Sequence, residues 1–127
     1  MEKKYELLKD KKNTIKHNGR ILHRIRALRD FNNIKAGELG GYIERERNLQ
    51  HTGLCWVYDK AKVYDDAIVC GNAQIYGYAE VCDGAIVCED AQVHGHAKVY
   101  GCAYVYGYAD IYGYSKICGN DKIGKYE

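Results

Sequence analysis

A six-residue pattern of apolar and polar positions repeats without interruption from Cys55 to Tyr126. The third residue of every hexad is Val or Ile, and the first residue is Ala in nine of the twelve hexads. The run is CWVYDK, AKVYDD, AIVCGN, AQIYGY, AEVCDG, AIVCED, AQVHGH, AKVYGC, AYVYGY, ADIYGY, SKICGN, DKIGKY. A fixed short period of this kind predicts a solenoid, in which each turn of the chain packs on the next.

Side chains alternate along a short strand, so positions one and three of each hexad point inward and positions two and four point outward. Position five is Gly in seven hexads, and Gly supplies the backbone freedom that a tight corner needs. Three hexads that close one triangular turn give an 18-residue rung, and neighbouring rungs lie roughly 4.8 Å apart. The pattern therefore predicts an all-β, parallel β-helix of about four triangular rungs.

The first 54 residues do not repeat. Asn18-Gly19 is a strong hairpin signal because both residues tolerate a positive φ, and it would join a strand near Asn13–His17 to a longer one near Arg20–Leu28. A solenoid needs a cap, since its first rung otherwise exposes apolar core and unpaired backbone. We predict two regions: a small β-rich N-terminal cap at 1–54 and a hexapeptide-repeat β-helix at 55–127.

The V-x-x-x-A spacing of residues 55–126 resembles the hexapeptide-repeat superfamily. That resemblance implies a left-handed parallel β-helix, and the superfamily includes trimeric acyltransferases and gamma-type carbonic anhydrases. The segment RIRALRDFNNIKAGELGGYIERERNLQHTGLCWVYDKAKVYDDA is similar to a cap-plus-repeat group of bacterial and phage proteins described as transferases (YdcK-like). One departure is that the residue after the aliphatic position is usually Tyr or Cys, where acyltransferase repeats more often carry Gly or a small residue.

The 18-residue rung assigns successive hexads to three faces, which begin at residues 55, 61 and 67. On the third face the outward positions form one continuous apolar stripe: Ile68, Cys70, Ile86, Cys88, Tyr104 and Tyr106. A soluble monomer seldom leaves such a stripe in water. We predict that it is an oligomer interface, most simply of a homotrimer, as the superfamily resemblance also implies. The alternative is that residues 1–54 fold back and cover it.

The first face is predicted to carry an aromatic edge of two columns. Position four supplies Tyr76, His94 and Tyr112, and the corner position six supplies Tyr78, His96 and Tyr114. Tyrosine gives large contact area and a hydroxyl donor, which is typical of binding surfaces. The alternative is a ladder of rings that only stabilises the stacked strands.

Charge is unevenly distributed along the chain. Residues 1–54 hold 13 Lys and Arg against 7 Asp and Glu, whereas residues 55–127 hold 6 against 10. Arg24 and Arg26 of the cap could meet phosphates, so we include them among the predicted binding residues. The acidic repeat argues against a long duplex nucleic acid and favours a small anionic ligand between subunits, or a protein partner.

Signals for catalysis and metal binding are weak. His94 and His96 are candidate general bases, but neither a Ser/His/Asp constellation nor a phosphate-binding glycine motif accompanies them. A gamma-type carbonic anhydrase site would require a third histidine at matching spacing, so we predict no metal. The six cysteines form no C-x-x-C pair and look like reduced structural thiols.

These observations predict a non-catalytic, self-associating β-helix that binds a ligand or protein through its aromatic edge and subunit grooves, with no cofactor. The phage resemblance suggests an accessory protein that sequesters a nucleotide signal or blocks a host defence protein. The alternative is a coenzyme-A-dependent acyltransferase that uses acetyl-CoA, with His94 or His96 as base. No apolar stretch approaches the roughly 18 residues of a membrane span, and MEKKYELLKDKK lacks a signal-peptide core, so we expect a cytoplasmic protein that does not enter a membrane.

Overall fold

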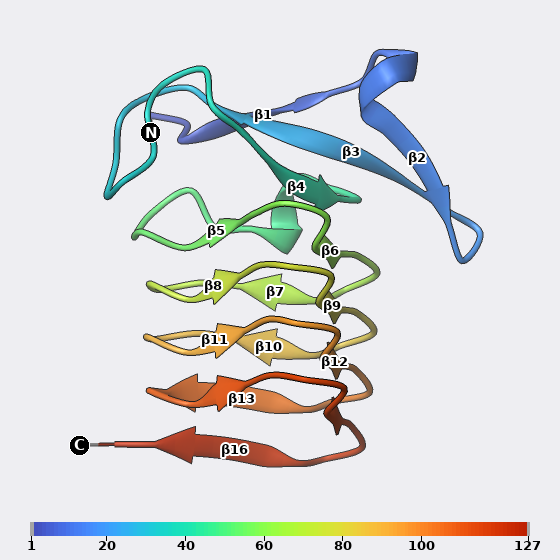
Figure 1. Ribbon diagram of the computed structural model, residues 1–127, viewed down its shortest axis with the longest axis vertical. Helices are drawn as coiled ribbons and strands as arrows, with labels where there is room; N and C mark the ends of the chain where they lie inside the picture. Colours follow the sequence, from blue (N-terminus) through green and yellow to red (C-terminus); the bar gives the residue numbers. More distant parts are fainter. Residues whose placement is uncertain (1, 127) are drawn as a thin grey trace.

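The computed structural model describes residues 2–126, which fold as a stack of triangular turns beneath an N-terminal cap (Figure 1). Each side of the stack is a parallel sheet. The first-face strands are β5 (Trp56–Val57), β8 (Gln74–Ile75), β11 (Gln92–Val93) and β14 (Asp110–Ile111). The second-face strands are β6 (Lys62–Val63), β9 (Glu80–Val81), β12 (Lys98–Val99) and β15 (Lys116–Ile117). The third-face strands are β7 (Ile68–Val69), β10 (Ile86–Val87), β13 (Tyr104–Gly107) and β16 (Lys122–Lys125).

The strand register confirms the 18-residue rung. On the first face Gln74 pairs with Gln92 and Gln92 pairs with Asp110. On the third face Ile68 pairs with Ile86 in the same way. Residues that lie 18 apart in the sequence are therefore vertical neighbours, and the predicted all-β parallel β-helix is confirmed.

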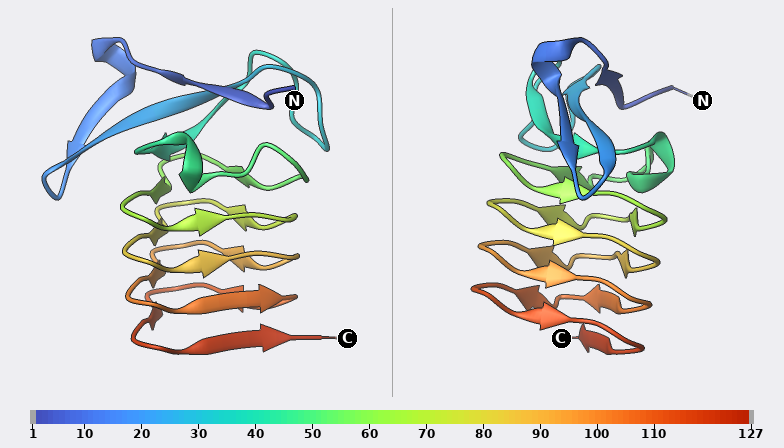
Figure 2. Two further views of the ribbon diagram at one scale, coloured as in Figure 1. Left: turned by 180° about the vertical axis from the view of Figure 1, so that it is seen from behind. Right: turned by 90° about the vertical axis from the view of Figure 1, so that its right-hand side faces the viewer.

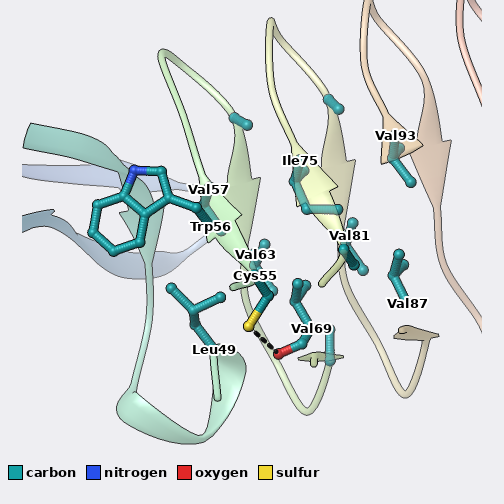
Figure 3. Packing of buried hydrophobic residues seen from close by; sticks show 14 of the residues in the cluster. Leu49, Cys55, Trp56, Val57, Val63, Val69, Ile75, Val81, Val87 and Val93 are labelled. Atoms are coloured by element: carbon teal, nitrogen blue, oxygen red, sulfur yellow. Dashed lines mark hydrogen bonds between the residues drawn. The ribbon is translucent and has the colours of Figure 1, made fainter. Parts of the chain in front are cut away.

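The core of the β-helix consists of the first and third residues of the hexads. The Ala and Val or Ile side chains at these positions are buried from Ala61 to Ile111, and Figure 3 shows how the aliphatic residues of successive turns line up. Burial of one such aliphatic side chain stabilises the fold by about 1.5–3 kcal/mol. The repeat thus gains its stability from contacts between turns, which no single hexad could make alone.

Trp56 occupies an outward position of its hexad but is not exposed to solvent. Its side chain is fully buried, because the cap closes over the first turn. Its indole packs edge-on against Phe31, with 5.2 Å between ring centroids, and against Tyr5 at 6.3 Å.

The cap is an antiparallel sheet. It comprises β1 (Tyr5–Leu8), the 3-10 turn η1 (Lys11–Asn13), β2 (Thr14–His17) and β3 (Arg20–Ala27), with β1 and β2 both paired to β3. The predicted hairpin at Asn18-Gly19 is present, and both residues have positive φ (51° and 77°).

Strand β4 (Leu39–Ile43) joins the cap to the β-helix. It pairs antiparallel with β3 on one side and parallel with β6 on the other. The 3-10 turn η2 (Glu46–Asn48) follows, and Leu49 then forms a parallel bridge to Val69. Parallel stacking therefore begins within the non-repeating segment, and five strands, β4, β6, β9, β12 and β15, stack on the second face. The β-helix has about five turns.

The β2–β3 hairpin hangs over the second face, as the right-hand view of Figure 2 shows. Leu22 packs there in a buried cluster with Tyr42, Tyr64 and Cys82. The contacts of this hairpin go to the second face, and the six side chains of the third-face stripe keep partly exposed surfaces. The cap therefore covers a different face from the apolar stripe.

Within the described residues, no helix has the length and apolar character needed to cross a bilayer.

Candidate ligand groove on the first face

A groove of about 750 Å³ runs along the first face, beneath the cap. Its floor is formed by the outward residues Gln74 and Gln92 of β8 and β11. Two vertical columns of side chains form its walls, because residues 18 apart stack. One wall contains Tyr58 and Tyr76, with Asp59 beside them, and the other contains Leu54, Asn72, Asp90 and Tyr108.

The cap provides the upper end of the groove. Phe31 and Ile34 form a small antiparallel bridge that carries Asn32 and Asn33 at its tip, and both asparagines line the groove. Asn32 has a φ of 51°, a value that Asn tolerates better than most residues. Phe31 anchors the loop against Trp56, so the buried tryptophan also positions the roof of the groove.

Hydrogen bonds hold the floor and walls in place. The Gln74 amide donates to the carbonyl oxygens of Leu54 (3.0 Å) and Asn72 (2.9 Å), and the Tyr76 hydroxyl donates to Gln92 Oε1 (2.8 Å). Gln74 Oε1 is buried and has no hydrogen-bond partner within residues 2–126. A buried acceptor without a donor is costly, so this atom favours a bound water or a ligand donor.

The charged side chains that line the groove, Asp59 and Asp90, are both acidic. Burial, followed by the charges of Glu38 and Asp59, raises the pKa of Tyr58. Burial and the charge of Asp110 raise the pKa of Tyr76 in the same way. None of the side chains that line the groove is a Lys or an Arg.

The six residues of the predicted aromatic edge form two stacked columns. In the first column the Tyr76 and His94 rings are parallel at 4.6 Å, and Tyr112 follows His94 at 5.9 Å. In the second column Tyr78 stacks on His96 at 4.9 Å, and His96 stacks on Tyr114 at 4.8 Å. Tyr76 belongs both to the groove wall and to the first column, whereas His94 and Tyr112 do not line the groove. The second column lies at the next corner and does not line the groove.

His94 is held by a carboxylate. Its Nε2 atom lies 2.7 Å from Asp110 Oδ1, the residue that follows Gln92 in the next turn. A neutral imidazole that donates from Nε2 keeps its lone pair on Nδ1, which is the form required of a general base. His96 has no such partner within residues 2–126. The two histidines lie in separate columns and therefore do not converge on one point.

Arg24 and Arg26 make contacts within the cap. Arg24 Nε donates to the Gly40 carbonyl at 2.9 Å, and its guanidinium lies over the Tyr42 ring. Arg26 pairs with Glu6, with Nε 2.9 Å from the carboxylate. Neither arginine lines the groove.

A metal-compatible group of three side chains, Asp65, Cys82 and Asp83, lies on the second face, away from both histidines. Arg20 already binds Asp65 there, with Nε 2.8 Å from Oδ1.

The third-face stripe is continuous. Ile68, Ile86 and Tyr104 are in register on β7, β10 and β13, and each is half-buried. Burial, and then the neighbouring Cys88 thiol, raises the pKa of Cys70 to about 12. Cys70 is therefore a neutral thiol at physiological pH, which keeps this face uncharged.

Among the residues that line the groove, only Tyr76 was predicted from the sequence to bind a ligand, and the floor, one wall and the roof were not predicted as parts of a site. The wall consists of position-six residues, and the 18-residue spacing of Leu54, Asn72, Asp90 and Tyr108 was the signal that could have identified it. The roof depends on how the cap loop packs on Trp56, and no repeat pattern encodes that contact.

Comparison with known proteins gives one short match. No family profile matches the chain. A 43-residue segment, 34% of the chain, is 44% identical to the "Uncharacterized acetyltransferase YdcK" of Escherichia coli (strain K12) and corresponds to 13% of that protein. Together with the observed β-helix, this match supports the hexapeptide-repeat resemblance. The chain spans only about an eighth of that relative's length.

Proposed function

We propose that this chain is a ligand-binding β-helix whose first-face groove holds a small polar molecule. The observation that carries the proposal is the groove itself, whose volume of about 750 Å³ falls in the range of small-molecule sites. Hydrogen bonds to the backbone and between side chains already hold Gln74, Tyr76 and Gln92 in place, which lowers the ordering cost of binding. The stacked rings below Tyr76 extend the surface on which a planar group can lie.

Self-association is part of this proposal. The wall that contains Asn72, Asp90 and Tyr108 forms the corner between the third-face and first-face strands. A second copy packed on the apolar third face would therefore border the groove. We propose a homo-oligomer, most simply a trimer, in which each groove lies beside a subunit boundary.

The residues that line the groove bear on the hypothesis that the protein sequesters a nucleotide signal. Phosphate groups are usually bound by Arg, Lys or backbone amides, and no cationic side chain lines the groove. A phosphorylated signal molecule is thus a poor fit to this groove. The anti-defence role depends on the phage resemblance alone.

A ligand screen with groove variants tests the proposal. We expect members of a library of sugars, amines, amino acids and nucleotides to raise the melting temperature of the parent protein. Tyr76→Ala should abolish the shift. Tyr114→Ala, which removes a ring of 79% exposure from the other column, should retain it. If ligands still raised the melting temperature of both the Tyr76→Ala and the Gln92→Ala variant, binding would lie elsewhere and the proposal would be contradicted.

Acyl transfer is a second candidate function. It is favoured by the His94–Asp110 pair and by the 43-residue similarity to a protein named as an acetyltransferase. Here the groove would hold the acceptor, and His94 Nδ1 would take the proton from its amine or hydroxyl as that group attacks the thioester carbonyl of acetyl-CoA. The acetyl group would move to the acceptor, and coenzyme A would leave as the thiol.

Release of free thiol from acetyl-CoA measures this activity. We expect His94→Ala to lower kcat by roughly a hundredfold or more, Asp110→Asn to lower it less, and His96→Ala to leave it unchanged. Activity that survives His94→Ala would exclude this residue as the base.

A further inference from the structure

Two carboxylates in the groove lack a cationic partner. Asp59 and Asp90 lie on opposite walls, and within residues 2–126 neither forms an ion pair with Lys, Arg or His. Each accepts one long hydrogen bond of 3.3 Å, Asp59 from the Gly77 amide and Asp90 from the Asn72 side chain. Both carboxylates therefore keep free lone pairs.

Aromatic surface accompanies each carboxylate. Tyr58 precedes Asp59 on one wall, and Tyr108 lies one turn below Asp90 on the other. Tyr108 is 57% exposed and, among the described residues, its ring packs against no other ring. The face of such a ring attracts a cation electrostatically.

The floor between the two walls contains a buried acceptor without a donor. Gln74 Oε1 is buried without a donor, whereas the Gln74 amide nitrogen is already bound to two carbonyl oxygens. The orientation of this side chain is therefore fixed with its oxygen unused. A protonated amine presents three N–H donors and a positive charge, which match an unpaired carboxylate that has an open ring face beside it, as on each wall of the groove.

We propose that the groove selects a small molecule bearing a protonated amine, with the rest of the molecule lying against the tyrosine rings. This inference rests on the proposed ligand-binding function and names its ligand class. It also fits the acyl-transfer candidate, in which an amine that loses its proton is a suitable acetyl acceptor.

Two matched probe pairs test the inference by ligand-observed NMR at slightly acidic pH. They are tyramine against tyrosol, its alcohol analogue, and glucosamine against glucose. We expect each amine to bind at least about tenfold more tightly than its neutral partner at low salt, and added salt should reduce the difference. Asp90→Asn should remove most of the preference, and Tyr108→Ala should weaken the amines. Asp66→Asn, at a different corner of the stack, is the control and should change nothing.

The outcomes separate the two proposals. Equal binding of amine and neutral partner, or an amine preference that persists in the Asp59→Asn, Asp90→Asn double variant, would overturn the amine inference. The ligand-binding function would stand in that case if Tyr76→Ala still abolished binding. If no probe and no member of the wider library bound at the groove, both proposals would fail.

Discussion

The fifth residue of each hexad determines how closely successive turns can stack. Seven of these residues are Gly with positive φ, and Asp59, Asp65, Asp83 and Glu89 adopt the same left-handed conformation at other corners. At Gly95 an added Cβ would lie 2.9 Å from the backbone nitrogen of Gly113 in the next turn, whereas at Gly113 it would meet nothing within 4 Å. Gly95 and Gly113 both require a positive φ, but only at Gly95 does the next turn leave no room for a Cβ.

Gly95→Ala and Gly113→Ala form a matched test of this difference. Both place a Cβ in the left-handed region, which costs about 1–2 kcal/mol. Gly95→Ala should lower the free energy of unfolding by roughly 1–3 kcal/mol more, because backbone must shift to relieve the clash. Urea unfolding of the two variants measures the difference. Equal losses would show that the turns separate easily at this corner.

Sequence periodicity predicted the direction of most side chains, because each hexad position has a fixed orientation. It did not predict the burial of Trp56, which depends on the cap, and it gave no distance between His94 and Asp110. The 18-residue period implies that Asp110 lies beside Gln92 in the next turn, two residues from His94. Only the side-chain torsions bring the carboxylate within hydrogen-bond distance.

The β2–β3 hairpin shows how one strand can bury opposite faces at its two ends. In β3, Leu22 is buried against the second face, whereas Ile25 and Ala27 belong to the main core and point the other way. Ile21 shares the face of Ile25 but is 45% exposed, because the hairpin extends beyond the stack there. The sequence predicted the turn and the alternation. It could not predict the face on which the hairpin docks, because that depends on the irregular pairing of β3 with β4.

A polar cluster fastens the hairpin to the second face. His17 Nε2 lies 3.0 Å from Glu80 Oε1, and the Tyr64 hydroxyl donates to the same oxygen at 2.8 Å. The Asn18 side chain donates to the Tyr64 hydroxyl at 3.0 Å. Although burial opposes it, the hydrogen bonds from His17 and Tyr64 lower the pKa of Glu80. A carboxyl with a lowered pKa stabilises the fold above its unfolded-state pKa, and this contribution is lost as pH falls through the folded-state value.

Glu80→Gln should loosen the hairpin while leaving the β-helix intact. We expect faster amide hydrogen exchange in residues 14–24 and a loss of about 1 kcal/mol, since a charge-assisted hydrogen bond is replaced by a neutral one. Lys116→Gln, in the same column but beyond the hairpin, is the control. Unchanged exchange in the hairpin would mean that the other contacts, those of Leu22, Asn18 and Arg20, are enough to hold it.

Several buried cysteine and tyrosine side chains, which lose a proton at alkaline pH, make the stability of the whole molecule depend on pH in that range. Burial and then Cys88 raise the pKa of Cys70 from 9.0 to about 12, and burial raises the pKa of Tyr5, Tyr64 and Cys55. In the unfolded chain these groups lose their protons at lower pH than in the folded protein. The folded state therefore binds more protons, and stability falls as pH rises above about 9. Lys4, whose pKa burial lowers, acts in the opposite direction.

We expect the urea midpoint to be flat between neutral pH and pH 8 and to fall progressively between about pH 9 and 12. Cys70→Ala removes one of the contributing groups and should make the decline shallower, whereas Cys102→Ala, at an exposed corner, should not change its slope. A urea midpoint that rises between about pH 9 and 12 would contradict the predicted direction of this pH dependence.

At the scale of the whole molecule, the largest effect that we predict is on self-association through the apolar third face. The cap docks on the second face and the groove occupies the first, so the stripe of Ile68, Ile86 and Tyr104 is the broad apolar surface that the fold leaves partly open to solvent. Ile86 lies in the middle strand of the register, between Ile68 above and Tyr104 below. A charge at this point would have to be buried in any interface formed by the stripe.

Ile86→Asp should therefore weaken self-association by roughly a hundredfold or more, equivalent to about 3 kcal/mol. Sedimentation velocity at micromolar concentration should show an oligomer for the parent and a monomer for this variant. Lys116→Asp changes charge on the second face and should leave the oligomer intact. Because β10 remains paired on both sides, circular dichroism of the Ile86→Asp monomer should match that of the parent. A parent that is already monomeric would remove the subunit boundary beside the groove, while the groove within one chain would still be available to a ligand.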